Sequence, residues 1–364
     1  MSSSFGENIR FSVFGQSHSE GIGVTIDGLP AGESVDMRRV AAFMHRRAPG
    51  NRRGDTARKE SDAVRVLSGI LDGKTCGAPL CGVIENTDAR SGDYAPMRRV
   101  PRPGHADYPL QVQCCGAQDW RGGGHSSGRL TAPLCFAGAV CLQILERRGV
   151  HIGAHLQSVG DRSERGFTPV LLAEEELHAP GLRAFPVLEE AAGERFQAAI
   201  LEVKEAGDSL GGVIECAAVG LPPGLGSPMF GGLENRLAAA LFGIPGCRGV
   251  EFGAGFAAAG MRGSENNDAY CCTAGEIRTE TNRHGGVLGG ISTGMPLLLR
   301  VAMKPTPSIA MPQRSVDPVN MEETELRIPG RHDACIAPRA VPVVEAITAC
   351  VLLDCMMEGK NGWL

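Results

Sequence analysis

Pairs of apolar strands joined by short, glycine-bearing turns recur along the chain and constrain its fold more than any other feature. The segments 9–28, 63–88, 196–222 and 285–309 each predict such a pair. Connections this short favour antiparallel neighbours, because parallel strands need a crossover of a dozen or more residues. The sheets are therefore predicted to be mainly antiparallel. CGVIE in the second segment resembles GGVIE in the third, which suggests an internal duplication.

Helical periodicity appears between these strand pairs. The predicted helices are 35–47, 131–148, 232–246 and 338–357. Their alternation with strand pairs predicts an α+β fold in which helices pack between or against antiparallel sheets. No linker composition divides the chain, so residues 1–364 are expected to form a single domain.

Composition excludes several functional classes. The formal net charge of −5 and pI of about 6.0 give no support for nucleic acid or an anionic membrane as partner. The longest apolar run, Leu130 to Leu145, is shorter than the roughly 20 residues that a membrane span needs. The chain starts without a secretory signal, and its 13 cysteines lack zinc-type spacing. We expect reduced thiols, a cytoplasmic location and no metal.

Arginine is concentrated locally even though the chain is mildly acidic. One cluster consists of Arg38, Arg39, Arg46, Arg47, Arg52, Arg53 and Arg58, and a second of Arg98, Arg99 and Arg102. Guanidinium groups bind carboxylates and phosphates in a bidentate manner. The clusters therefore indicate a small polyanionic ligand.

Several polar loops carry candidate chemistry, and one of them is the strand tip with Ser17 and His18. RPGHAD (102–107) sets three functional groups on irregular backbone, and MKPTPSI (303–309) offers Lys304, Thr306 and Ser308 between prolines. RGGGHSSGRLTAP (121–133) leads into a helix, whose free N–H groups attract anions. GRHD (330–333) precedes the last helix. Together they predict a site for phosphate and carboxylate, without defining a reaction.

Two further segments resemble nucleotide-binding motifs but do not match their patterns. SGILDGKT (68–75) lacks the first glycine of a P-loop and precedes a strand instead of a helix. GAGFAAAG (253–260) lacks dinucleotide-binding spacing and is interpreted as a close-packed strand.

Read jointly, seven motifs resemble the chorismate synthase family. They are FGQSHSEGIGVTIDGLPAG, RRAPG, RPGHADY, RGGGHSSGRLTAP, GGVLGGISTG, MKPTPSI and GRHDACIAPRAVPVVEA, and they keep the family's order from about Phe11 to Asp354. The resemblance implies the family's β-α-β sandwich and a homotetramer. It also implies a lyase of the shikimate pathway, which leads to the aromatic amino acids.

The implied reaction is a 1,4-anti elimination of phosphate from 5-enolpyruvylshikimate 3-phosphate, giving chorismate. The family requires reduced FMN, although the reaction has no net redox change. Because the departing hydrogen is not acidified by a carbonyl, a cofactor must supply the difficult chemistry. The chain shows no reductase domain, so NADPH is expected to act only as an external reductant.

The resemblance also implies roles for single residues. His105 protonates the reduced flavin and His18 acts as an acid near the departing phosphate, while Asp333 and Ser17 relay a proton. The implied FMN contacts are His125, Ser126, Ser127, Pro245, Gly246, Gly289, Lys304, Pro305, Thr306, Pro307, Ser308 and Arg331. The implied substrate arginines are Arg47, Arg53, Arg102 and Arg129, of which Arg47 and Arg53 are alternatively assigned to NADPH.

Three positions depart from the common family pattern. Gln16 and Ser19 replace Glu and Gly beside His18, and His125 stands where many members have Arg. Two other functions stay open at this level. One is transfer of phosphate to or from a sugar-like acid, and the other is flavin binding without catalysis.

Overall fold

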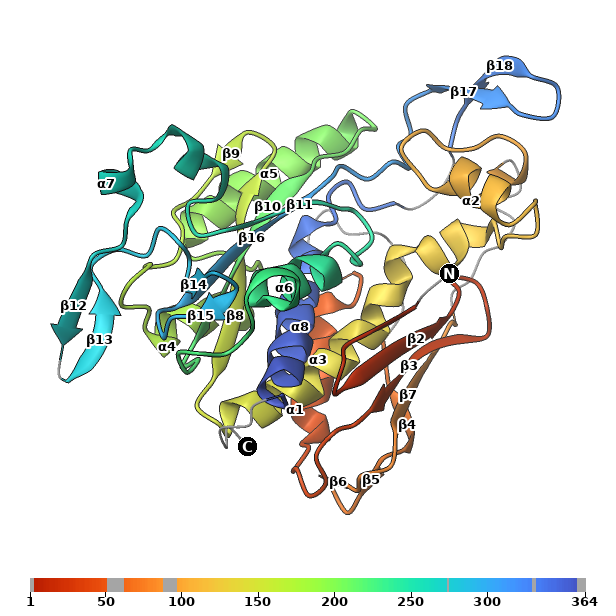
Figure 1. Cartoon of the computed structure of the whole chain (residues 1–364). Coiled ribbons are helices and arrows are strands. Elements are labelled where there is room, and N and C mark those ends of the chain that lie inside the picture. Colours follow the sequence, from red (N-terminus) through yellow and green to blue (C-terminus); the bar gives the residue numbers. More distant parts are fainter. Residues whose placement is uncertain (1–2, 51–61, 88–96, 274, 329–331, 359–364) are drawn as a thin grey trace.

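Two five-stranded sheets form the outer layers of the molecule, and three helices lie between them (Figure 1). The computed structural model describes residues 3–50, 62–87, 97–273, 275–328 and 332–358. The first sheet has the order β1 (Ser4–Phe5), β2 (Arg10–Gly15), β3 (Gly21–Asp27), β7 (Leu80–Glu85), β4 (Arg65–Ser68). The second has the order β11 (Cys247–Phe252), β16 (Leu297–Met303), β10 (Gly212–Val219), β8 (His151–Val159), β9 (Arg162–Ser163). Neighbouring strands pair antiparallel throughout both sheets, as predicted.

The central layer consists of α1 (Met37–Arg47), α3 (Thr131–Glu146) and α8 (Ala337–Met356). Of these, α1 packs on α3 and α8 through one face, with Val40 and Met44 buried, whereas a helix enclosed on every side must be apolar all round. Accordingly, α3 is buried from Thr131 to Leu145, and α8 is buried along nearly its whole length. This layering confirms the predicted α+β sandwich.

Buried polar contacts fix the central helices to their surroundings. The Asp354 carboxylate near the end of α8 accepts backbone N–H bonds from Glu7, Asn8 and Ile9 at 2.7 to 2.9 Å. Arg46 of α1 forms a bidentate pair with Glu345 of α8. These contacts hold α1 and α8 in a defined register beside the first sheet.

The remaining elements cover the second sheet or project from the sandwich (Figure 1). The helices are α2 (Asp107–Gln113), α4 (Glu174–Leu182), α5 (Glu190–Glu205), α6 (Leu233–Leu241) and α7 (Gly263–Asn266), with 3₁₀ turns η2 (Arg121–Ser126), η3 (Gly128–Leu130), η4 (Met229–Gly231) and η5 (Gly255–Gly260). The small hairpins are β5–β6 (Ile70–Leu71, Lys74–Thr75), β12–β13 (Tyr270–Thr273, Glu276–Thr279), β14–β15 (Val287–Leu288, Ile291–Ser292) and β17–β18 (Gln313–Asp317, Glu322–Leu326).

The four predicted helices are confirmed as α1, α3, α6 and α8, but two predicted strands are wrong. Residues 196–205 belong to α5, because Ala192, Phe196, Ala199 and Ile200 are buried at helical spacing. The proposed duplication therefore fails, since β7 follows a strand whereas β10 follows a helix. Of the segment 253–260, residues Gly255–Gly260 form the 3₁₀ turn η5, and positive φ angles at Gly253 and Gly255 interrupt any strand there.

Among the residues that the structure describes, one segment, Gly128–Glu146, is long and apolar enough to cross a membrane by length and composition alone. In this fold 89% of its most apolar window is buried inside the protein. It therefore serves as the central helix of the sandwich.

Gly138 sets the distance between α3 and α8, because a Cβ there would lie 2.2 Å from Ala346. Alanine normally stabilises a helix relative to glycine. Here we expect Gly138→Ala to lower the free energy of unfolding by about 1–3 kcal/mol through overpacking. Urea denaturation measures this, with Gly263→Ala as control, since no atom lies within 4 Å of that Cβ position. Equal stability of the two variants would contradict this packing.

Candidate active site

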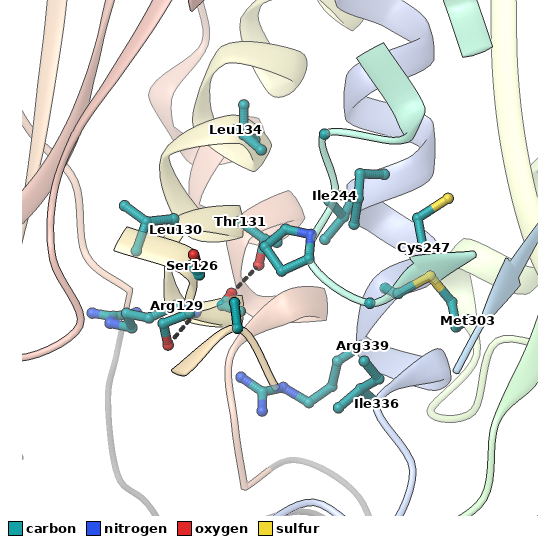
Figure 2. A pocket seen from close by; sticks show the side chains of 18 of the residues that line it. Ser126, Arg129, Leu130, Thr131, Leu134, Ile244, Cys247, Met303, Ile336 and Arg339 are labelled. Atoms are coloured by element: carbon teal, nitrogen blue, oxygen red, sulfur yellow. Dashed lines mark hydrogen bonds between the residues drawn. The ribbon is translucent and has the colours of Figure 1, made fainter. Parts of the chain in front are cut away.

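A cavity of about 830 Å³ opens at the start of α3 and α8 and the end of α1, and it collects residues from distant parts of the chain. Figure 2 shows Arg129 and Thr131 at the start of α3, Arg339 at the start of α8, and Met303 at the end of β16. The predicted residues that line it are Arg47, Arg102, His105, His125, Ser126, Ser127, Arg129, Pro245, Gly246, Lys304, Pro305, Thr306, Pro307, Ser308 and Asp333.

Of the other predicted site residues that the structure describes, none lines this cavity. Ser17 and His18 lie directly behind its wall, whereas Gly289 lies in the turn of the β14–β15 hairpin. Arg53 and Arg331 fall outside the described residues.

The loop of three glycines allows the two predicted catalytic histidines to approach the cavity. A Cβ at Gly122 would lie 2.4 Å from the His18 ring, and a Cβ at Gly123 would lie 2.8 Å from His105 Nε2. Both glycines also have positive φ, 58° and 86°. Only glycine satisfies both requirements, so this sequence fixes the backbone between the histidines.

His18 is buried and held by its neighbour. Its Nδ1 is hydrogen-bonded to Ser17 Oγ at 3.1 Å, and the Ser17 amide donates to the Gly124 carbonyl at 3.0 Å. Both side chains are therefore fixed against the glycine loop.

Asp107 orients the predicted substrate arginine and the second histidine together. It accepts a bidentate pair from Arg102 at 2.7 and 2.8 Å, and its Oδ1 lies 2.6 Å from His105 Nδ1. Burial alone would raise the pKa of Asp107, but the hydrogen bonds from Arg102 and His105 outweigh it and hold that pKa far below its usual range. Arg102 Nη2 also lies 3.2 Å from His105 Nδ1 and 3.4 Å from its Nε2, so the guanidinium group borders both ring nitrogens.

Asp62 joins two other predicted substrate arginines. It is fully buried, accepts from Arg47 Nη1 at 2.6 Å, and accepts a very short bond from Arg129 Nη1. Burial would raise the pKa of Asp62, but the charges of Arg47 and Arg129 lower it below its usual range. The pair is thus oriented by an internal carboxylate.

Asp333 also has an arginine partner. Arg339 Nη1 donates to Asp333 Oδ2, and Arg339 Nε donates to the Arg47 carbonyl at 3.1 Å. Arg339 therefore links the start of α8 to the end of α1 at the edge of the cavity.

Sequence reasoning missed Asp62, Asp107 and Arg339 as site residues. Asp107 and Arg339 lie inside the quoted motifs RPGHAD and APRAV, so a search for carboxylate partners near each arginine would have found them. Asp62 ends a charged stretch without periodicity, and no quoted motif contains it, so the sequence does not mark it as a site residue.

His125, which stands where many family members have Arg, directs both ring nitrogens to protein groups. Its Nδ1 lies 2.7 Å from the Gly15 carbonyl oxygen, so this nitrogen must donate, and its Nε2 lies 2.7 Å from Ser3 Oγ. Both ring nitrogens thus bond the protein. The imidazole anchors the N-terminal segment to the cavity wall.

The segment after β16 completes the cavity. Lys304 donates to the Gly104 carbonyl and Ser308 Oγ accepts from Arg102 at 3.2 Å, so this segment is tied to the RPGHAD loop. Thr306 Oγ1 is buried in the cavity wall and has no hydrogen-bond partner among the described residues. Burial lowers the pKa of Lys304, and Arg248 lowers it further.

The near-P-loop segment lies elsewhere in the fold. Residues 70–75 form the β5–β6 hairpin around Asp72 and Gly73, and no helix follows. This geometry cannot present the row of backbone N–H groups that a P-loop needs.

Removing the charge of Asp62 should destabilise the protein. Because Asp62→Asn leaves two buried guanidinium groups without their shared carboxylate, we expect the free energy of unfolding to fall by about 3–5 kcal/mol. Inorganic phosphate should recover part of this loss by binding the arginines in the folded state. Denaturant titration with and without phosphate measures both effects.

The exposed turn variant Asp72→Asn provides the control and should behave as wild type. Because the Asp62 pKa is lowered on folding, its contribution is present above the unfolded value near 3.8 and is lost as pH falls below it. An Asp62→Asn protein as stable as wild type at neutral pH would contradict the assigned role.

Comparisons with known proteins agree on one family. The family model described as chorismate synthase matches residues 9–357. Curated chorismate synthases of Thermococcus kodakarensis and Thermococcus gammatolerans are 45% and 46% identical to this chain, each alignment covering 98% of both chains. That of Lancefieldella parvula is 42% identical over 100% of this chain and 99% of its own.

A solved structure agrees with the sequence comparisons. A crystal structure of chorismate synthase superimposes with a TM-score of 0.74 and 28% identity, covering 98% of this chain and 94% of the other. The family model, the full-length relatives and the fold agree with a cavity that is lined by residues from five of the seven motifs. The chain belongs to the chorismate synthase family.

Proposed function

We propose that this protein catalyses the reduced-FMN-dependent 1,4-anti elimination of phosphate from 5-enolpyruvylshikimate 3-phosphate, yielding chorismate. The observation that carries the proposal is the single cavity in which three predicted substrate arginines meet His105 and, across the glycine loop, His18. Its volume of about 830 Å³ lies near the upper end of ordinary ligand sites, roughly 300–1,000 Å³. This supports a cofactor and a substrate bound together.

The cavity wall fits a flavin. Ile244, Met303 and Ile336 supply an apolar side for a flat ring system (Figure 2). Thr306 Oγ1 is a buried polar atom without a partner among the described residues, which a ligand with polar edges would satisfy. In our proposal the residues 304–308, Ser126, Ser127, Pro245 and Gly246 hold FMN, with Arg331 as an additional contact. When bound, reduced FMN supplies electron density as phosphate leaves and takes up the hydrogen, without net redox change.

The charges suit a substrate with two carboxylates and a phosphate. Among the described lining residues, the cations are Arg47, Arg102, Arg129, Lys304 and Arg339, against the carboxylate of Asp333. The N-termini of α3 and α8 also open here and favour anions. Asp62 and Asp107 lie behind the arginines and orient them, which lowers the ordering cost of binding. We assign Arg47, Arg53, Arg102 and Arg129 to the substrate.

The histidines supply protons from opposite sides of the glycine loop. His105, oriented by Asp107 through Nδ1, donates a proton from Nε2 toward the flavin. His18, fixed by Ser17, donates toward the departing phosphate. Asp333 receives the proton of the transferred hydrogen, with the Ser17 hydroxyl as relay. Imidazole suits both acid roles, because its pKa lies near neutrality.

Further features of the family extend the proposal to the cellular level. We assign the protein to aromatic amino acid biosynthesis through the shikimate pathway, as a cytoplasmic homotetramer. NADPH serves as an external reductant of the flavin and not as a partner in the elimination.

An anaerobic assay tests the proposed reaction. Protein, FMN, dithionite and 5-enolpyruvylshikimate 3-phosphate should yield chorismate and phosphate in equal amounts, while the flavin ends fully reduced. Oxidised FMN without reductant should yield neither. Phosphate release without chorismate, or no product with reduced FMN present, would refute the proposal.

Replacing each histidine tests its role. We expect His105→Ala and His18→Ala each to lower turnover by about 10²–10⁴-fold, the usual contribution of a general acid or base. His45→Ala, at an exposed position of α1 away from the cavity, should keep wild-type turnover. The assay is initial-rate chorismate formation with saturating reduced FMN. Near-wild-type turnover in either cavity variant would remove that histidine from the mechanism.

A further inference from the structure

We propose that His151, Glu174 and His178 form a solvent-facing site for a divalent metal ion of the zinc type, separate from the active-site cavity. His151 is the first residue of β8, and Glu174 and His178 lie on α4. Their spacing of four residues puts Glu174 and His178 on one face of that helix. Because α4 packs against β8, this face meets His151.

The distances are close to those of a coordination site. The possible donor atoms of the three side chains all lie within 4.8 Å of one another, and His151 Nε2 is 3.4 Å from Glu174 Oε1. Donors bound to tetrahedral zinc at ~2.0–2.1 Å lie ~3.3–3.4 Å apart. The His151–Glu174 pair already has this separation. Closing the remaining gap needs only side-chain rotation, which the 57% exposed Glu174 side chain permits.

The donor set selects the class of ion. Two imidazoles and one carboxylate match Zn²⁺ and leave a fourth position for water, whereas Ca²⁺ and Mg²⁺ prefer oxygen donors throughout. The spacing of His151 from the other two residues gives no motif in the sequence, which explains why no metal was expected. Only the packing of α4 on β8 brings them together.

The site is remote from the proposed chemistry. None of the three residues lines the active-site cavity. Figure 1 shows α4 at the end of the molecule opposite α2 and the β17–β18 hairpin. A bound ion would therefore fasten α4 to strand β8 of the second sheet without entering the elimination reaction.

Titration of the chelator-treated full chain with ZnCl₂ tests this proposal by calorimetry. Exposed thiols such as Cys76, Cys115 and Cys272 are first carboxymethylated, because thiolates compete for zinc. We expect one equivalent to bind and the melting temperature to rise with it. His178→Ala and Glu174→Gln should each weaken binding at least tenfold.

Glu175→Gln is the matched control, since Glu175 is the adjacent exposed acid of the same helix turn and is not part of the cluster. It should bind zinc as wild type does. Co²⁺ in place of Zn²⁺ should give the visible absorption of a tetrahedral site with nitrogen and oxygen donors. Absence of stoichiometric binding in the wild type, or equal affinities of Glu174→Gln and Glu175→Gln, would overturn the proposal.

Discussion

The buried contact of Asp62 with Arg47 and Arg129 is the interaction on which the active-site geometry depends. Arg47 closes α1, and Arg129 precedes α3, so one carboxylate joins two helices of the central layer. Two cations this close would repel strongly in a dry interior. The carboxylate makes their proximity stable. Arg47 Nε and Nη2 donate to Thr131 Oγ1 and the Gly128 carbonyl at 3.1 Å each, which fixes Arg47 to the segment that leads into α3.

The same arrangement recurs around the cavity. Asp107 holds Arg102, and Asp333 contacts Arg339. These carboxylate–arginine contacts come from different parts of the chain. Together they form a set of cations that the protein itself orients before any ligand binds. Such preorganisation favours binding of a rigid polyanion, since fewer long side chains must be ordered when it arrives. It also shows how a mildly acidic protein can gather oriented cations in one cavity.

The glycine loop brings two histidines close to this electrostatic framework. Gly122 contacts the His18–Ser17 pair, and Gly123 contacts His105. A side chain at either position would push a histidine out of place. The RGGGHSSGRLTAP motif is thus required by the close approach of two imidazoles to one backbone segment as well as by the start of α3.

Much of this structure was predictable from local sequence patterns. Apolar periodicity located α1, α3, α6 and α8, and the motif loops located most of the cavity wall. Local patterns failed where tertiary packing decides. The burial of Ala199 and Ile200 against the second sheet makes 196–205 helical despite its strand-like composition. Asp62 could not be recognised because its partners lie 15 and 67 residues away along the chain.

A crystal structure with oxidised FMN and 5-enolpyruvylshikimate 3-phosphate would test the central claim most directly. The account predicts the substrate phosphate or a carboxylate within hydrogen-bonding distance of both Arg47 and Arg129, with Asp62 still between them, and the flavin ring against Met303 and Ile336. Density for the two ligands in separate regions, or arginines that turn away from the substrate, would contradict it.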